Sequence, residues 1–425
     1  MNKIFSWLYR LAGPVRRSDI AGPIAFLVIG SVFRVMWPAD MEWKADEQSN
    51  FARAIAAARD GVFPWLGTPS SADILNPGFS IWPFALVARF NPGPVAMVQW
   101  VQWSNVIALW AFFWLFTRAV SAEERGVWLW GLALFAVSPF AVMFSRKLWM
   151  PDILPIFGVA VLWGHFYRRR RIGAFTWGLA GALIGQVHLS GFFFAFALVW
   201  ATVVRDSQRA ELRATRWVYW IAGSLIGGAI LFPWLSAFVT GHAGHSTYQL
   251  REVVTLNFYA QWFLAAWGLL LAGPRYAGVE FLREPLVWGY PTYLMLLAHI
   301  VMGGVSLWIT LRWFATGLRP RFDDHLTLYL LVTFIVVGAL LTLSGVRVRA
   351  FYLIVVAPFI HLWAAGMMWP RRRLLASLVA TQMLVSATFL VFVHRQGGVP
   401  STEYGWSYRA QHAGGVLNLS PPARK

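Results

Sequence analysis

Residues 290–312 read YPTYLMLLAHIVMGGVSLWITLR, an apolar run whose one formally charged side chain, Arg312, stands at its end. An α-helix needs about 20 mostly apolar residues to cross the hydrocarbon core of a bilayer, and this run meets that length. The whole chain of 425 residues is 58% hydrophobic and 13% charged, with a mean hydropathy of +0.56. This composition excludes an ordinary soluble domain and predicts an all-α, polytopic integral membrane protein.

The same length rule, applied along the sequence, predicts about 11 transmembrane helices, with ends placed to within about four residues. They are expected at roughly 20–37, 95–117, 126–144, 152–167, 172–187, 189–204, 217–239, 290–312, 325–344, 350–369 and 372–393. One more apolar segment, roughly 255–273, would reverse the charge bias of all later loops if it crossed. It is therefore interpreted as a helix that lies on the outer face or dips into it.

The chain has 36 Lys and Arg against 18 Asp and Glu. Much of the excess is in short loops, such as RRRR at 168–171 and RRR at 371–373, which is typical of cytoplasmic loops. With a cytoplasmic N-terminus, the cytoplasmic segments hold about 20 Lys and Arg in roughly 60 residues, and the outer segments hold about 15 in roughly 150. We therefore expect the membrane bilayer as the partner of this charge, and no nucleic acid.

The predicted organisation is a single transmembrane domain over residues 1–393, followed by a short, partly disordered outer tail at 394–425. Two long outer loops, 38–94 and 240–289, are expected to carry amphipathic surface helices. A preference for Arg over Lys suggests a GC-rich bacterial genome. The predicted location is thus the bacterial inner membrane, with the C-terminus in the periplasm. Since loops carry function on a rigid scaffold, we expect the functional site on the outer side.

Acidic residues and cations from separate outer loops are the candidates for chemistry. Asp46 and Glu47 begin an expected surface helix, where acidic residues also simply stabilise the helix dipole. Asp152 caps the fourth predicted span or lies just inside it, after Arg146 and Lys147. Carboxylates and cations together at membrane depth suit deprotonation of an acceptor hydroxyl and binding of an anionic leaving group.

Three further residues have both a functional and a structural interpretation. His188 lies between two apolar runs and serves either in a site or in packing. Arg347 and Arg349 stand at an outer end, against the positive-inside trend. Their guanidinium groups suit a phosphate, and the alternative is that they extend to lipid headgroups. There is no cysteine, which excludes disulfides and thiolate metal sites.

The arrangement resembles GT-C membrane glycosyltransferases. An Arg late in the first span, the acidic pair, a small-residue helix and NPGF at 76–79 are similar to their first-loop signature. SPFAVMFSRKLWMPDILPIF, at 138–157, resembles their second signature. FYLIVVAP at 351–358 looks like their late Arg-Tyr run, with Tyr352 in place but Phe351 where Arg is frequent. Asn76 also stands where His is common. The likeness is greatest to protein O-mannosyltransferases and aminoarabinose transferases, the family 39-like group.

This resemblance implies a GT-C-like fold and an enzyme that transfers a sugar from a polyprenyl-phosphate donor to a glycan, lipid or protein acceptor. Asp46 would be the general base, and Glu47 and Asp152 would position the acceptor, the sugar or a metal. The implied phosphate-binding residues are Arg146, Lys147, Arg347 and Arg349, and the implied substrate-binding residues are His188, Asn76 and Tyr352. No cofactor is fixed by the sequence, and a divalent cation such as Mg or Mn on Asp46, Glu47 or Asp152 stays open.

Two other functions compete with this prediction. An O-antigen ligase or polymerase is also polytopic, but such an enzyme would centre on a long late outer loop, whereas the acidic pair lies in the first loop. A non-enzymatic transporter or flippase of lipid-linked glycans would show charged residues at mid-span depth, and few are present. The glycosyltransferase interpretation is therefore preferred.

Overall fold

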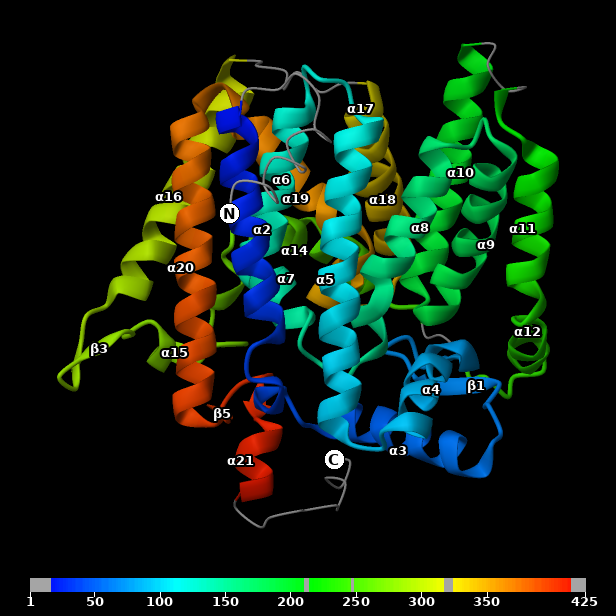
Figure 1. The fold of residues 1–425 in the computed structure, drawn as a ribbon, viewed down its shortest axis with the longest axis horizontal. Coiled ribbons are helices and arrows are strands. Elements are labelled where there is room, and N and C mark those ends of the chain that lie inside the picture. The colour runs from blue at the N-terminus through cyan, green and yellow to red at the C-terminus, as the bar shows by residue number, and fades with distance from the viewer. Residues whose placement is uncertain (1–16, 210–213, 246–247, 317–323, 414–425) are drawn as a thin grey trace.

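The computed structural model of the chain is almost entirely helical (Figure 1). It describes residues 17–209, 214–245, 248–316 and 324–413. The final part of the predicted tail, 414–425, lies outside the described residues. The predicted all-α, polytopic membrane fold class is confirmed, because helices follow the apolar runs from one end of the described chain to the other.

Helical elements occupy all the predicted spans, several of them with a break. They are α2 (Arg17–Val35), α5 (Pro94–Ala119), α6 (Arg125–Val137) with α7 (Pro139–Phe144), α8 (Leu154–Phe166), α9 (Arg171–Val187), α10 (Ser190–Gln208), α11 (Trp217–Ala229) with α12 (Phe232–Val239), α16 (Leu294–Thr316), α17 (Asp324–Leu330) with the π-helical η6 (Leu331–Val336) and α18 (Val337–Leu343), η7 (Ala350–Val356) with α19 (Ala357–Met368), and η8 (Trp369–Arg371) with α20 (Arg372–Gln396).

Length and hydropathy set a stricter standard for a membrane span than helix formation does. Within the described residues, 3 helical runs meet it: Leu294–Arg312, His325–Leu343 and Ala350–Gln396. The pair α11 and α12, bent by 65°, raises this number to 4 if it forms one span. Shorter apolar helices, including Ile20–Val35 and Met150–Phe166, fall below the length limit. The number of crossings therefore stays a prediction.

Short elements gather in the predicted outer loops. They are η1 (Pro38–Asp40), α3 (Ala45–Asp60), β1 (Leu66–Pro69), β2 (Leu75–Pro77), η2 (Gly78–Ser80), α4 (Trp82–Phe90), η3 (Met150–Ile153), α13 (Leu250–Val254), α14 (Asn257–Ala266), η5 (Leu270–Ala272), α15 (Gly278–Phe281), β3 (Leu286–Val287), β4 (Tyr290–Pro291), β5 (Gly398–Val399), β6 (Gly405–Trp406) and α21 (Tyr408–Ala413). Consecutive strands pair as antiparallel hairpins. Figure 1 shows α3, α4, β5 and α21 at one end of the bundle.

Helix α3 is the surface helix that the sequence predicts in the first outer loop. Its start is fixed locally, because the backbone N–H of Lys44 donates to the Glu47 carboxylate at 3.1 Å. It ends at Gly61, whose φ of 68° is a left-handed conformation that glycine adopts without strain. One face of α3, which includes Glu47 and Asn50, is buried against the rest of the protein.

The segment 255–273 does not form a long helix. Helix α14 covers 10 of its residues and packs against α18 and α19, with Trp262 and Ala266 buried. It ends before Gly268, whose φ is 71°. Because about 20 residues are needed to cross a bilayer, α14 enters the bundle without spanning it.

The core places α6 between α2 and α19. Gly30 of α2 lies so close to α6 that a Cβ there would collide with the Ala136 carbonyl. The fully buried Arg34 donates to the carbonyls of Phe135 and Ala136 and thereby ties the end of α2 to the same place.

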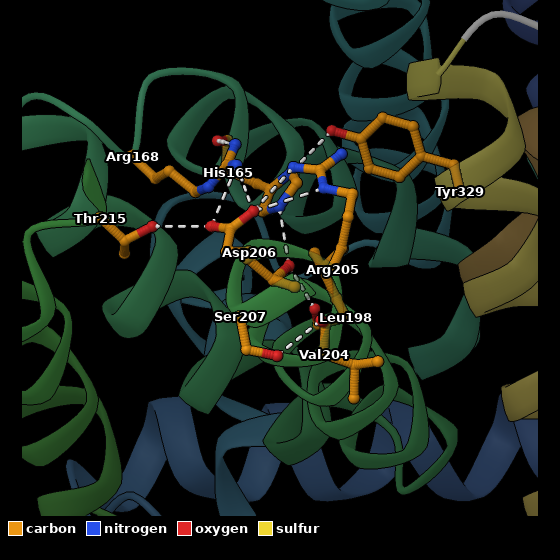
Figure 2. Close-up of polar contacts among 10 residues, drawn as sticks. His165, Arg168, Leu198, Val204, Arg205, Asp206, Ser207, Thr215 and Tyr329 are labelled. Atoms are coloured by element: carbon orange, nitrogen blue, oxygen red, sulfur yellow. Dashed lines mark hydrogen bonds and ion pairs between the residues drawn. The ribbon is translucent and has the colours of Figure 1, made fainter. Parts of the chain in front are cut away.

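A buried polar cluster lies at the end of α8 that is remote from Asp152 (Figure 2). Arg168 contacts the Asp206 carboxylate at 3.2 Å, and Thr215 also donates to that carboxylate. Beside them, His165 forms a hydrogen bond of 2.8 Å with Tyr329. These contacts satisfy polar groups inside the bundle and join α8 to α10 and α17.

Candidate functional site

The carboxylates that begin the first outer loop face a cavity of about 200 Å³. Its walls come from separate parts of the chain: the start of α3, the loop between α7 and α8, the 273–277 loop, the loop before η7, and the segment between β5 and β6. Its charged residues are Glu42, Lys44, Asp46, Glu47, Lys147, Arg349 and Glu403. Charges from segments far apart in sequence thus meet around one small volume.

A second cavity, of about 730 Å³, adjoins the first one and shares Asp46, Trp149, Arg349 and Phe351 with it. Its other walls include Asn76 at the β1–β2 hairpin and the Ser70–Ser71 turn. The two cavities therefore meet at a carboxylate, a guanidinium and two aromatic rings. Such a place can hold one polar group between two larger moieties.

Asp46 occupies the first turn of α3 and is exposed to both cavities. No cation forms an ion pair with its carboxylate within the part of the chain that the structure describes. It stands at the N-terminus of α3, which carries a partial positive charge. Asp46 is thus an accessible carboxyl group whose lone pairs remain available to a ligand.

Glu47, one residue later, is buried. Burial, together with the negative charge of Glu42, raises the pKa of Glu47 to about 8, although Lys147 and Lys44 act in the opposite direction. A carboxyl group with this pKa is largely protonated at neutral pH, so it can donate a hydrogen bond as well as accept one. The adjacent acidic residues that look equivalent in sequence therefore differ in environment.

Lys147 contacts the Glu42 carboxylate, which also contacts Lys44. Burial alone would lower the pKa of Lys147, but the negative charges of Glu42 and Glu47 outweigh burial and raise it. Its ammonium also lies 5.0 Å from the centre of the Phe144 ring. Glu42 could not be predicted from the sequence, because nothing in MEWK at 41–44 distinguishes a carboxylate that will be buried beside a distant lysine.

His188, Asn76 and Tyr352 lie around the larger cavity. His188 and Asn76 line it, and burial lowers the pKa of His188 to about 4, so that its imidazole is neutral. Asn76 donates to the Thr68 carbonyl at 3.0 Å, while its own amide oxygen is buried and has no hydrogen-bond partner in the part of the chain that the structure describes. Tyr352 lines neither cavity, but its hydroxyl lies 2.6 Å from the hydroxyl of Ser71, and Ser71 lines the larger cavity.

Asp152 is fully buried and does not line either cavity. Its backbone carbonyl accepts a hydrogen bond of 2.7 Å from Asn105, while both carboxylate oxygens lack a hydrogen-bond partner among the described residues. Lys147 supplies the positive charge that acts on it. Asp152 thus interacts with a charge of the cluster but lies outside both cavities.

Arg146 and Arg347 are not brought to the cavities. The Arg146 guanidinium donates to the carbonyls of Phe33, at 2.8 Å, and of Trp37, at 3.1 Å, and so caps the end of α2. Arg347 is exposed to the surroundings and lines neither cavity. Of the predicted phosphate-binding cations, the structure therefore places Lys147 and Arg349 at the site.

Glu403 lines the smaller cavity and pairs with Arg275, which lines neither cavity, and neither residue could be singled out from the sequence. The Arg275 guanidinium lies 2.8 Å from the Glu403 carboxylate, and Arg349 lies 3.6 Å from the same oxygen. The expected partly disordered tail is folded as far as residue 413, and Glu403 comes from its β5–β6 hairpin. Apart from its acidic side chain, the sequence around Glu403 offers no signal for this position.

Among the described residues, no three or more His, Asp or Glu side chains lie together in a way that could hold a metal ion. Within the cluster, Glu42 and Glu403 already contact lysine or arginine side chains. The donor set is thus mixed with cations, unlike the all-oxygen shell that Mg²⁺ prefers.

Comparison with known proteins gives a structural match. No protein-family model matches the chain, and no curated protein matches it in sequence. The fold is similar to the crystal structure of ArnT from Cupriavidus metallidurans bound to undecaprenyl phosphate, with a TM-score of 0.50 and 16% sequence identity. The match covers 82% of this chain, which spans 60% of the length of that solved chain. The predicted resemblance to GT-C membrane glycosyltransferases is therefore confirmed at the level of the fold.

Proposed function

We propose that this protein is a membrane glycosyltransferase that moves a sugar from a polyprenyl-phosphate donor to an acceptor hydroxyl. The observation that carries the proposal is the position of Asp46, an accessible carboxylate at the junction of two cavities, with Arg349 at the same junction and Lys147 in one wall. This arrangement provides a base and cations around one polar centre. The fold match to a structure bound to undecaprenyl phosphate supports the class of donor.

In the proposed reaction, the acceptor oxygen attacks the anomeric carbon of the sugar while its proton passes to Asp46. The new bond joins that carbon to the acceptor oxygen, and the bond between the carbon and the phosphate oxygen breaks. The electron pair of the broken bond leaves with the phosphate. Asp46 suits the role of base because it is exposed and lines both cavities.

The proposed cations for the departing phosphate are Lys147 and Arg349. Lys147 is held in place by Glu42, and Arg349 reaches both cavities. Glu47 is proposed to hold the acceptor or the sugar through a hydrogen bond, and Asp152 to position Lys147 from behind. A divalent cation remains part of the proposal only as an option, which dialysis against a chelator before the assay would test.

The proposed location is the bacterial inner membrane with the site in the periplasm. The charge bias of the loops supports this orientation, because the cavities lie at the end of the bundle that carries the long, less basic loops. The donor is a hexosyl or pentosyl polyprenyl phosphate, and the acceptor is a glycan, a lipid or a protein. Comparison of envelope glycans between the parent and a deletion strain would identify the product.

The proposal is tested by the change Asp46→Asn, assayed in membranes with a defined polyprenyl-phosphate sugar. Loss of a general base is expected to lower turnover by about 100-fold or more, because the amide cannot take the proton. Asp60→Asn, at the exposed far end of the same helix, is the matched control and should keep the parental rate. Parental turnover in a folded Asp46→Asn variant would disprove the assignment.

A further inference from the structure

The C-terminal hairpin places a carboxylate among the cations of the site. The Glu403 carboxylate lies 2.8 Å from Arg275 and 3.6 Å from Arg349. The backbone carbonyl of the same residue accepts a hydrogen bond from the Lys44 ammonium. One residue of the tail therefore contacts cations from three other segments, in the wall of the 200 Å³ cavity.

The position of this carboxylate is built into the fold. The backbone N–H of Glu403 donates to the Arg275 carbonyl at 2.7 Å, and the Thr402 hydroxyl donates to the Tyr276 carbonyl at 3.0 Å. At the base of the hairpin, the Tyr404 hydroxyl donates to the Asp40 carbonyl at 2.6 Å. These bonds fix the backbone on both sides of the side chain, so its presence among the cations does not depend on a flexible loop.

The charges around Glu403 indicate that its carboxylate occupies the place of a ligand anion. Burial would raise the pKa of Glu403, but the bond to Arg275 and the charges of Arg275 and Arg349 outweigh it and lower the pKa. The group is therefore an anion at neutral pH. It is nevertheless 41% exposed, and Arg275 and Arg349 are each 36% exposed, so none of these side chains is closed off from its surroundings. Exposed ion pairs are weak and can exchange partners.

We infer that Glu403 is an internal anion that occupies an Arg275–Arg349 clamp until the phosphate of the substrate displaces it. The inference rests on the proposed function and adds two residues to it. Arg275 is the second arm of the clamp, and Glu403 is the competing anion that pairs with both arginines until the phosphate binds. A phosphate is the stronger partner, because it offers more oxygens and more charge to two forked guanidinium groups than one carboxylate does.

The experiment measures binding of two probes, farnesyl phosphate and inorganic phosphate, to the detergent-purified protein by calorimetry. Glu403→Gln removes the competing charge but keeps the shape of the side chain. We expect it to bind farnesyl phosphate at least about threefold more tightly than the parent, because an exposed ion pair no longer has to be broken. A purely structural role for Glu403 would weaken binding instead.

Control variants separate the possible causes. Glu403→Asp keeps the charge and should restore the parental affinity. Glu280→Gln removes the same charge from α15, outside both cavities, and should change nothing. Arg275→Met should weaken binding by about threefold or more. Glu403→Ala, with the same expectation as the glutamine variant, takes its place if that variant does not fold.

The outcomes distinguish this inference from the proposed function. Tighter binding of both probes means that any phosphate displaces Glu403, and tighter binding of farnesyl phosphate alone means that the lipid-linked group does. If the parent binds farnesyl phosphate and Glu403→Gln binds it equally or less tightly, the inference is wrong while the proposed donor class stands. If neither protein binds farnesyl phosphate, both are wrong.

Discussion

The adjacent acidic residues Asp46 and Glu47 show that burial can give similar carboxyl groups different properties. Asp46 is exposed at the first turn of α3, and Glu47 is buried at its N-terminal side against Glu42 and Lys147. Because burial penalises the charged form, the Glu47 carboxyl keeps its proton over a pH range in which an exposed carboxyl has lost it. The sequence predicts the pair, but only packing buries Glu47 and leaves Asp46 exposed.

The stability of the protein should therefore fall as Glu47 ionises. The pKa of Glu47 is raised from 4.5 to about 8, so its contribution to stability is fully present below about pH 4.5 and is lost as the pH rises through about 8. We expect thermal unfolding in detergent to move to lower temperature between about pH 5 and pH 9. Glu47→Gln, which stays neutral throughout, should show a smaller decrease. An equal decrease in both proteins would contradict the raised pKa.

The positions of the helices could be predicted from the sequence more accurately than the side-chain contacts between them. The spans 95–117 and 172–187 are matched by α5 and α9 within a few residues, because helix formation follows a local apolar pattern. The Asp46-Glu47 start of α3 follows from local charge and composition in the same way. Arg146 was not predictable, since whether a guanidinium faces a cavity or a helix end depends on contacts more than 100 residues away.

The role of Arg146 as a cap of α2 can be tested by mutation. Its guanidinium caps the C-terminal end of α2 through the carbonyls of Phe33, Arg34, Met36 and Trp37. A lysine keeps the charge but cannot reach several carbonyls at once. We expect Arg146→Lys to lower the free energy of unfolding by about 2 kcal/mol, measured by thermal unfolding in detergent.

The exposed Arg53→Lys on α3 is the matched control and should have parental stability. The sequence-based interpretation of Arg146 as a phosphate ligand predicts a different result. In that case Arg146→Lys would keep the parental stability and would weaken binding of farnesyl phosphate. The pair of measurements thus decides between a cap and a ligand.

At the scale of the whole molecule, five of the segments that the charge bias predicts to be outer come together around one cavity. Residues of the first outer loop, the loops at 145–151 and 345–349, the long loop at 240–289 and the tail line the same small cavity. Alternation of the spans predicts that these segments share one side, and their convergence agrees with it. Which of their side chains touch could not be predicted, because neither the hairpin that carries Glu403 nor the burial of Glu42 has a local sequence pattern.

Asp40 connects the first outer loop to the C-terminal segment. It is buried in η1, and its carboxylate lies 2.6 Å from Arg409 of α21 and 2.6 Å from His394 near the end of α20. The ring of His394 also stacks on Trp37, with 4.1 Å between the ring centres. The first outer loop therefore holds the C-terminal segment in the position from which Glu403 enters the cavity wall.

The change Asp40→Asn should release that segment while the bundle stays folded. Loss of the ion pair with Arg409 and weakening of the hydrogen bond with His394 cost about 1.4 kcal/mol, which is a tenfold change in the opening equilibrium, since both partners are partly exposed. Hydrogen exchange of residues 398–413 should accelerate by about tenfold, with exchange in α5 and α6 unchanged. Asp60→Asn, which removes an exposed ion pair with Arg59, should leave the tail as in the parent. Unchanged exchange in 398–413 would show that the hairpin bonds alone hold the segment, and uniformly faster exchange would show that Asp40 stabilises the whole bundle.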